Sequence, residues 1–405
     1  MNKRVWRTSL AVVGASLCLS ACSSVPVVGE WFADEAELEV RELASIQATK
    51  SLQVAWRAQA GNGIGDFFSS LQPAYADGKV FVASRDGVVK ALDDSGKTLW
   101  QTRIGSAGGW FGEGVSAKLA GGLTVGANKV FVGTEDGRLL GLNVDSGAIE
   151  FDTTVVGEII AKPQIDSGMV FVNTTAGRLF ALNLETGEEV WMHESDVPPL
   201  SLRGISTPTV TNGGVLVGTP TGKLQVNIMD SGLVAWEATV TTPSGATELE
   251  RIIDVDSQPI IAPTGIVYIV SFNGSLAAVE LRSGRVVWQR EYASYRNLAL
   301  AGTRLVVTTV NGSVFALDSR NGVEMWSQSG LKGRNLTAPV IHKGQVIVGD
   351  KFGVVHSIDL NEGTLTGRAM LNNDEDARFY APAVIAGEQI VLQNAQGNVY
   401  ALTIQ

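Results

Sequence analysis

The sequence predicts an all-β fold, an eight-bladed β-propeller of four-stranded antiparallel blades. Three observations predict it: a recurring turn glycine, an aromatic residue at a second periodic position, and chain ends out of register with the repeat. The turn glycines are Gly87, Gly137, Gly177, Gly222, Gly274, Gly312, Gly353 and Gly397. They lie 50, 40, 45, 52, 38, 41 and 44 residues apart, between apolar runs such as V-F-V-A-S and A-L-D. Eight such units built from short apolar strands are typical of a propeller.

The second periodic position lies four residues after a later turn glycine of each unit. Its occupants are Trp100, Phe151, Trp191, Trp236, Trp288, Trp326 and Gly367. A large ring repeated at one place in every blade is expected in the core, where each buries of order 150–250 Å². These rings are therefore predicted to pack blade against blade, with ligand stacking as the less favoured alternative. Gly367 departs from the pattern.

The first and last units are both incomplete. Residues 382–402 supply three strands and then the chain ends, whereas residues 54–56 read as a strand without a blade of its own. The N-terminal strand is therefore predicted to complete the last blade. This arrangement closes the ring and removes both unpaired edges.

Residues 1–21 have the pattern of an export signal. Three basic residues precede an apolar stretch, residues 10–19, that is too short to span a bilayer. The following L-S-A-C resembles a bacterial lipobox, which predicts lipidation of Cys22. A plain signal peptide with an unrelated cysteine is the alternative. In lipoproteins of this type Asp after the cysteine favours inner-membrane retention, so Ser23 indicates the periplasmic face of the outer membrane.

The cysteine content and the net charge limit the classes of partner that the protein can have. Cleavage before Cys22 would remove Cys18 and leave no free thiol and no disulfide. Removing the three basic residues of the signal from the 31 in the chain leaves 28 against 41 acidic residues, a net charge of −13. This charge argues against nucleic acid and against anionic lipid, so membrane contact is expected through the anchor alone. Residues 22–50 are predicted to be a flexible tether, and residues 51–405 the propeller.

Three long insertions fall in the connections between blades, over residues 102–117, 192–207 and 238–257. In a four-stranded blade, this connection shares a face with the turn between the second and third strands. The insertions are therefore expected on one rim, and loops on a rigid scaffold often carry binding.

Five side chains in these insertions could form a binding site: Leu200, Leu202, Arg203, Asp254 and Asp256. The arginine offers a planar fork of donors, the aspartates offer acceptors, and the leucines offer apolar anchors. The alternative from the residues alone is that the leucines pack under their own loop and the aspartates cap turns.

The pattern A-L-D-x-x-x-G-x-x-x-W at residues 316–326 resembles the pyrroloquinoline-quinone-type propeller repeat. Three segments narrow the resemblance: G-N-G-I-G-D-F-F at 61–68, L-S-L-R-G at 200–204 and D-V-D-S-Q-P at 254–259. With the lipobox, they resemble the BamB family, lipoproteins of the outer-membrane β-barrel assembly machinery (the BAM complex). The resemblance covers the whole mature chain.

This resemblance implies a non-enzymatic scaffold that binds BamA through its periplasmic POTRA domains and assists the assembly and insertion of β-barrel proteins. By the same resemblance, the residues expected to contact BamA are Leu200, Leu202, Arg203, Asp254 and Asp256, and each of them is the residue type found in the family. Unfolded outer-membrane proteins are a further partner by analogy, through pairing with an exposed strand edge.

Two alternatives use the same fold. A quinone-dependent periplasmic dehydrogenase typically needs calcium held by carboxylates and an amide, a general-base Asp and, in many cases, paired cysteines. His193, His342 and His356 lack metal-ligand spacing and are expected on strands or loops, so no catalytic residue, metal or cofactor is predicted. The second alternative is a glycan- or peptide-binding propeller, for which Trp110 and Phe111 are the best aromatic candidates.

Overall fold

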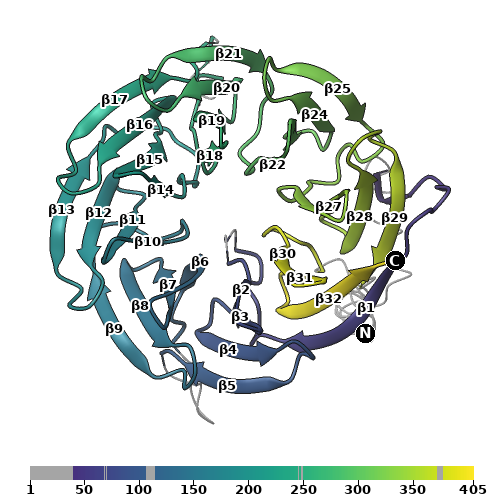
Figure 1. The fold of residues 1–405 in the computed structure, drawn as a ribbon. Helices are drawn as coiled ribbons and strands as arrows, with labels where there is room; N and C mark the ends of the chain where they lie inside the picture. The colour runs from purple at the N-terminus through teal and green to yellow at the C-terminus, as the bar shows by residue number, and fades with distance from the viewer. Residues whose placement is uncertain are drawn as a thin grey trace, which may run out of the picture. The chain divides into compact units, whose positions relative to one another are not determined.

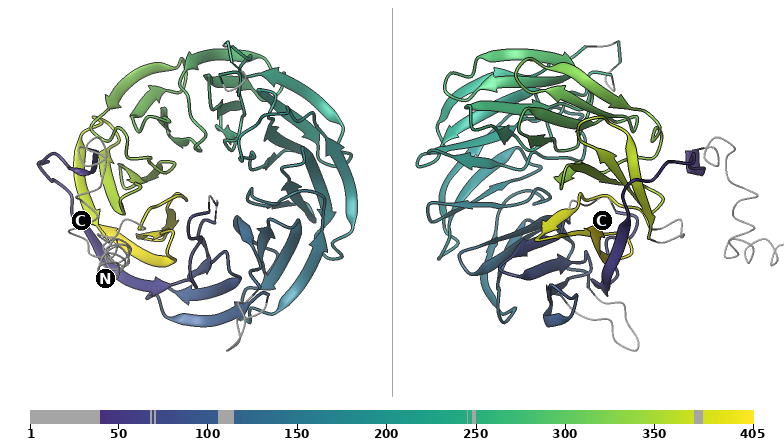
Figure 2. Two further views of the ribbon diagram at one scale, coloured as in Figure 1. Left: turned by 180° about the vertical axis from the view of Figure 1, so that it is seen from behind. Right: turned by 45° about the vertical axis from the view of Figure 1, so that its right-hand side comes forward.

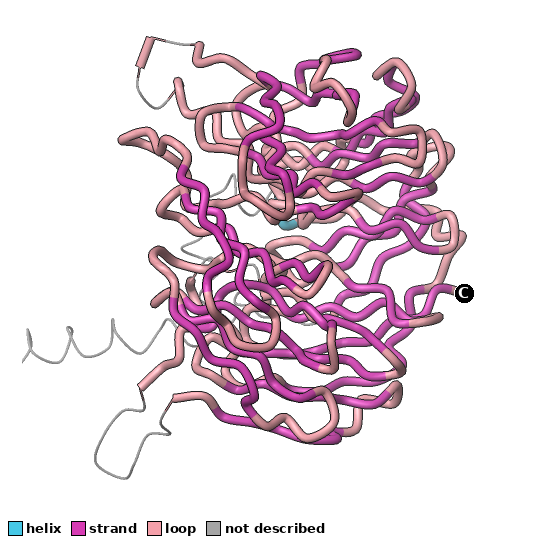
Figure 3. Tube along the Cα trace, turned by 60° about the vertical axis from the view of Figure 1, so that its left-hand side comes forward, coloured by secondary structure: helices cyan, strands magenta, loops and turns pink. Residues whose placement is uncertain are grey.

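The computed structural model describes residues 40–67, 69, 71–105, 115–244, 246–247, 250–371 and 377–405. Its contacts divide the chain after Ser45, and the fold concerns the unit from Ile46 to Gln405. This unit consists of strands and loops (Figure 3). Within the described residues, no helix has both the length and the apolar character needed to cross a membrane.

Eight four-stranded antiparallel sheets surround a central axis, as predicted (Figure 1). Each sheet is called a blade, and its first strand lies nearest the axis while its fourth lies at the outer rim. Blade 1 contains β2 (Ala74–Ala76), β3 (Lys79–Ala83), β4 (Val88–Asp93) and β5 (Thr98–Arg103). Blade 2 contains β6 (Leu119–Gly126), β7 (Lys129–Thr134), β8 (Arg138–Asn143) and β9 (Ile149–Thr154). Blade 3 contains β10 (Gln164–Asp166), β11 (Met169–Asn173), β12 (Arg178–Asn183) and β13 (Glu189–Glu194).

The remaining blades follow the same order. Blade 4 contains β14 (Thr209–Thr211), β15 (Gly214–Gly218), β16 (Lys223–Ile228) and β17 (Val234–Thr239). Blade 5 contains β18 (Ile260–Ile261), β19 (Ile266–Val270), β20 (Ser275–Glu280) and β21 (Val286–Glu291). Blade 6 contains β22 (Ala299–Ala301), β23 (Arg304–Thr308), β24 (Val314–Asp318) and β25 (Val323–Gln328). Blade 7 contains β26 (Val340–His342), β27 (Gln345–Gly349), β28 (Val354–Asp359) and β29 (Leu365–Met370). Blade 8 contains β30 (Val384–Ala386), β31 (Gln389–Gln393), β32 (Asn398–Ile404) and β1 (Leu52–Gln59).

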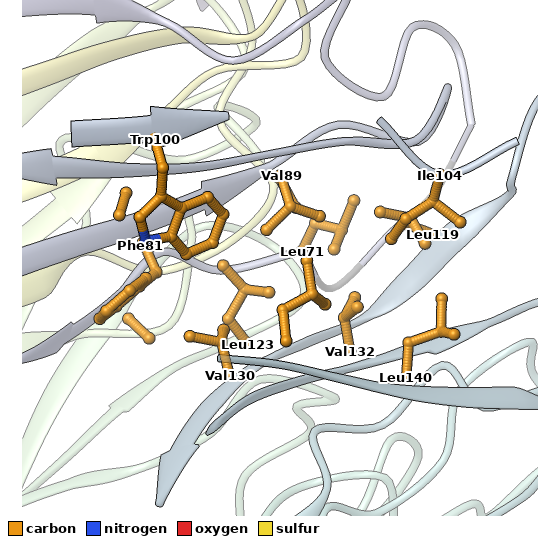
Figure 4. Close-up of a cluster of buried hydrophobic side chains, with 14 of the residues drawn as sticks. Leu71, Phe81, Val89, Trp100, Ile104, Leu119, Leu123, Val130, Val132 and Leu140 are labelled. Carbon is orange, nitrogen blue, oxygen red and sulfur yellow. The ribbon is translucent and has the colours of Figure 1, made fainter. Parts of the chain in front are cut away.

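The second and third strands of each blade form the core because neighbouring blades cover both of their faces. Strand β11 is one example, with four of its five residues buried in the run MVFVN. Such runs lack polar alternation, as expected for strands that are buried on both sides. Between blades 1 and 2, Phe81 and Val89 pack in one cluster with Val130 and Leu140 (Figure 4).

The predicted ring closure is confirmed. Strand β1 pairs antiparallel with β32, from Leu52 opposite Ile404 to Gln59 opposite Asn398. The first and last strands of the chain therefore lie side by side in blade 8 (Figure 2). The sheet order β1-β32-β31-β30 shows that the N-terminal strand takes the outermost place.

The predicted packing of the periodic tryptophans is also confirmed. The Trp191 indole N–H donates to the Met229 carbonyl of the next blade at 2.6 Å, and the Trp288 indole does the same to Ser319 at 3.0 Å. Each ring rests on a turn glycine of that next blade. A Cβ atom on Gly232, where φ is +70°, would lie 2.5 Å from the Trp191 ring. This glycine therefore provides both a left-handed turn and the room for the ring.

The packing also explains why Gly367 replaces the tryptophan in blade 7. The next blade has no turn glycine to receive a ring there, because its fourth strand comes from the N-terminus. The entering chain takes the place instead: the amides of Thr49 and Lys50 donate to the Thr366 carbonyl at 2.8 and 2.9 Å. A Cβ atom on Gly367 would lie 2.6 Å from the Lys50 carbonyl oxygen. The departure from the repeat thus marks where the chain enters the ring.

Candidate functional site

The long insertions leave their blades on one face of the ring. The first amide after the fourth strand donates to the turn glycine between the second and third strands, as Ile104 does to Gly87 at 2.7 Å and Ser195 to Gly177 at 2.8 Å. We call this surface, formed by the inter-blade connections and these turns, the connection face. It carries all the predicted partner-binding residues. Trp110 and Phe111 lie outside the described residues.

Leu200, Leu202 and Arg203 lie together in the connection between β13 and β14. Leu200 is 49% exposed and Leu202 is partly buried. The Arg203 side chain is 42% exposed. The apolar anchor is therefore presented to solvent at Leu200, while Leu202 turns toward the protein.

The Arg203 guanidinium is already paired with two glutamates, one in blade 2 and one in the connection between blades 2 and 3. Its Nη2 lies 3.2 Å from Glu135 Oε1 and 3.2 Å from Glu158 Oε2. Glu135 also accepts two bonds from Arg85, at 3.1 and 2.7 Å. Burial opposes the ionisation of Glu135, but the hydrogen bonds from Arg85 and Arg203 outweigh it and hold its pKa below the ordinary value. The Arg85 guanidinium lies 3.6 Å from the centroid of the half-exposed Phe67 ring.

We call this set the rim network, and it joins blades 1 and 2 and the connection between blades 2 and 3 to the loop at 200–203. Its members are Phe67, Arg85, Glu135, Glu158 and Arg203. Sequence reasoning missed Phe67 as a side-chain partner and the other three residues altogether. A signal was present, since Arg85 and Glu135 hold the same turn position in consecutive repeats and have opposite charges.

Asp254 does not offer its carboxylate to a partner at the surface, contrary to what was expected of it as a binding residue. Its side chain is only 2% exposed. One carboxylate oxygen, Oδ2, accepts the Leu202 amide N–H in a short hydrogen bond, whereas Oδ1 has no partner among the described residues. Asp254 therefore holds the loop at 200–203 from below and does not itself present a contact surface.

Asp256 lies partly buried beside a cavity of about 400 Å³ that opens on the connection face. It packs against the loop so closely that a Cβ atom on Gly204 would lie 2.0 Å from Asp256 Oδ2. Its carboxyl has no hydrogen bond or ion pair within the described part of the chain. Burial raises the pKa of Asp254 to about 6, and burial together with the charge of Asp254 raises the pKa of Asp256 to about 8.

We expect Asp256→Asn to raise the melting temperature at pH 8 and to change it little at about pH 4. The folded-state pKa of Asp256 lies above its unfolded value, so the native state binds more protons and the free energy of unfolding falls as pH rises between about 4 and about 8. Thermal melts across this range measure the effect. Asp318→Asn is the control of opposite sign, because hydrogen bonds from Arg320 lower the pKa of Asp318 to about 2. An unchanged pH slope in Asp256→Asn would contradict the expectation.

The fold and the site define a propeller of the scaffold type, a rigid ring that presents loops on one face. Within the described residues, no group of three or more His, Cys, Asp or Glu side chains could hold a metal ion. The family model for the outer membrane protein assembly factor BamB matches residues 3–110, 85–328 and 298–405. The chain belongs to the BamB family.

Known BamB proteins are similar in sequence to this chain over nearly its full length. The assembly factor BamB of Alteromonas naphthalenivorans is 45% identical across 96% of this chain and 94% of the relative. That of Shewanella oneidensis is 37% identical across 98% and 99%. The crystal structure of BamB from Moraxella catarrhalis superposes with a TM-score of 0.76 at 24% identity, covering 87% of this chain and 99% of that one. The relatives are assembly factors, which favours the non-enzymatic prediction over the dehydrogenase.

Proposed function

We propose that this chain is a non-enzymatic scaffold that binds the POTRA domains of BamA through the loop at 200–203, on the periplasmic face of the outer membrane. Membership of the BamB family places it in the BAM complex, in association with the outer membrane and with the assembly of its proteins. One observation supports the BamA contact most directly: the loop is fixed in the free protein, by Asp254 from below and by the rim network from the side. A preorganised loop loses little conformational entropy on binding.

The members of the proposed site have different roles. Leu200 is the exposed apolar anchor, and Arg203 offers charge at the edge of the loop. A partner carboxylate would share Arg203 with Glu135 and Glu158 or replace one of them. Asp254 is a positioning residue that acts through the Leu202 amide. Asp256 supports the loop through its contact with Gly204.

We expect Arg203→Ala to weaken POTRA binding by about 2 kcal/mol or more, as for a hot-spot arginine. Little fold stability should be lost, because Arg203 itself is 42% exposed and the more buried Glu135 keeps its two bonds from Arg85. Leu200→Ala should weaken binding by shortening the anchor. Asp254→Asn should weaken it less, since the amide oxygen can still accept the Leu202 N–H. Calorimetric titration with the isolated POTRA domains measures each variant, and circular dichroism checks its fold.

Arg320→Ala is the matched control. Like Arg203, Arg320 is an exposed arginine that pairs with a carboxylate: its side chain is 74% exposed and it pairs with Asp318 at the turn between β24 and β25. It should bind as the wild type does. If Arg203→Ala and Leu200→Ala also bind normally, the assignment fails and the search moves to the opposite face of the ring.

We further propose that residues 1–21 are a signal peptide, that Cys22 is the lipidated N-terminus of the mature chain and that residues 22–50 are the tether. These residues lie mostly outside the described part of the chain. The last two residues of this tether, Thr49 and Lys50, are held against blade 7 by the Thr366 carbonyl. Cys22→Ala should leave a folded propeller that no longer sediments with the outer membrane in cells lacking BamA, because acyl chains supply about 0.8 kcal/mol per buried CH₂. Fractionation of wild type and variant measures this. Unchanged sedimentation of the variant would contradict the anchor.

A further inference from the structure

The cavity beside Asp256 lies where the chain enters the first strands of most blades, on the connection face. Its lining includes a residue directly before a proline in six connections: Gln72, Lys162, Thr207, Gln258, Ala338 and Ala381. Only Lys162 is charged at this repeated position. The repeat itself therefore does not require a lysine there. A volume of about 400 Å³ is in the range of sites for small ligands.

Lys162 is partly buried at the cavity wall and has no counter-ion among the described residues. Within the described residues, its ammonium group makes no hydrogen bond or ion pair, and burial lowers its pKa. A desolvated amine without a partner destabilises a fold. Such a group is most readily explained where a ligand supplies the missing counter-charge. Asp256 lines the same cavity but does not pair with Lys162.

Arg296 adds a second positive charge to the cavity wall. Its Nη1 donates to the Tyr380 carbonyl at 3.0 Å, and its guanidinium carbon lies 4.5 Å from the centroid of the Tyr295 ring. Its Nε is buried without a hydrogen-bond partner, and no carboxylate pairs with it among the described residues. Burial lowers the pKa of Arg296 as well. The two cations give the cavity a positive potential that Asp256 does not neutralise by pairing.

An apolar wall faces the same space. The Phe272 and Tyr295 rings both line the cavity, with centroids 6.2 Å apart and planes at 48°. Leu202 lines it from the loop at 200–203. The cavity therefore combines uncompensated positive charge with aromatic surface, which is the arrangement that recognises an anion attached to an apolar body.

We propose that this cavity is a binding site for an organic carboxylate, whose carboxylate group pairs with Lys162 and whose apolar body lies against Phe272 and Tyr295. Arg296 reinforces the attraction, and the Asp256 carboxyl accepts or donates a hydrogen bond at the far side. The same chemistry can come from a free small molecule or from the C-terminal carboxylate of a polypeptide. This site goes beyond the scaffold function, although Leu202 and Arg203 belong to both.

Calorimetric titration of the mature chain tests the proposal with three probes: phenylacetate, N-acetyl-phenylalanine and the neutral amide of N-acetyl-phenylalanine. We expect both carboxylates to bind and the amide to bind at least about tenfold more weakly. Tighter binding of N-acetyl-phenylalanine than of phenylacetate would identify a chain terminus as the source, and the reverse a small molecule.

Lys162→Met is the test variant, because it keeps an unbranched side chain that is only one heavy atom shorter and removes the charge. It should lower carboxylate affinity about tenfold or more while raising the melting temperature, since it removes an unpaired buried charge. Lys97→Met, an exposed lysine in the turn between β4 and β5, is the control and should change neither.

Three results would each overturn the site: no binding of either carboxylate at about 10 mM, equal binding of carboxylate and amide, or unchanged affinity in Lys162→Met. POTRA binding by Lys162→Met should remain normal. A failure of the carboxylate site therefore leaves the scaffold function standing, and a failure of POTRA binding leaves this site to be judged on its own titration.

Discussion

Deleting residues 1–56 is expected to unfold the whole propeller, whereas deleting residues 1–45 should leave its melting temperature unchanged. The longer deletion removes most of β1, which is the fourth strand of blade 8. It exposes the hydrogen-bonding edge of β32 and opens the contact between the last blade and the first, so the damage is not confined to one blade. The shorter deletion ends at the boundary before Ile46 and keeps β1 complete.

Trp56 provides the point-mutation version of this test. Its ring packs on Gly96 of blade 1, where a Cβ atom would lie 2.6 Å from the indole, and its Nε1–H donates to Gln389 at 2.9 Å. Trp56→Ala should therefore cost about 3–5 kcal/mol of unfolding free energy. Thermal and urea unfolding measure both changes. Ring closure by β1 would have no stabilising role if the 1–56 deletion melted at the full-length temperature.

The fold could be predicted because its information is local and repeated. A glycine with positive φ recurs at the same turn in most blades, and an aromatic ring recurs where most blades meet the next one. Even ring closure is visible in the sequence, since the ends supply complementary parts of one blade. The exception at Gly367 was visible too, but its reason was not, because that reason is the Lys50 backbone more than 300 residues away.

The site was predicted only in part, because its properties depend on which blades become neighbours. The sequence placed Arg203 in a binding loop, but not beside Glu135 of blade 2 and Glu158 of the connection between blades 2 and 3. It gave Asp254 and Asp256 one shared role, whereas the structure buries the first under the loop and leaves the second against a cavity. Burial of a single side chain is set by the packing of distant segments, and no local pattern specifies it.

His356 shows the same limit inside the core. It was expected to lie on a strand or in a loop, and it does lie on β28, but it is fully buried. Its Nε2–H donates to Asp350 Oδ2 at 2.8 Å, and Arg334 Nε donates to the same oxygen at 2.6 Å. Burial lowers the pKa of His356, so Arg334 supplies the positive charge of this cluster. Burial opposes the ionisation of Asp350, but the bonds from His356 and the charge of Arg334 outweigh it, and the pKa of Asp350 is lowered.

Asp350 also begins the turn between β27 and β28, where its Oδ1 accepts the amides of Phe352 and Val354 at 2.9 Å each. Other blades use a neutral side chain at this turn position. Ser84 in blade 1 accepts the Val88 amide at 3.2 Å, and Asn394 in blade 8 accepts the Asn398 amide at 2.8 Å. The turn alone therefore does not require a charge, and the carboxylate of blade 7 is explained by the two donors that meet it in the core.

Asp350→Ala should consequently destabilise the propeller by about 3–5 kcal/mol, because it removes one partner of a buried ion pair together with the acceptor of two turn amides. Ser84→Ala is the matched control at the equivalent position, where the loss of one neutral acceptor should cost about 1 kcal/mol. Asp350→Asn should fall between them. Its amide oxygen can preserve the turn, but its NH₂ group would stand where Oδ2 accepts from His356 and Arg334, so both of these bonds are lost together with the charge. Urea unfolding at neutral pH ranks the three variants. If Asp350→Ala costs no more than Ser84→Ala, the buried cluster contributes nothing beyond the turn, and the charge at Asp350 would need another explanation.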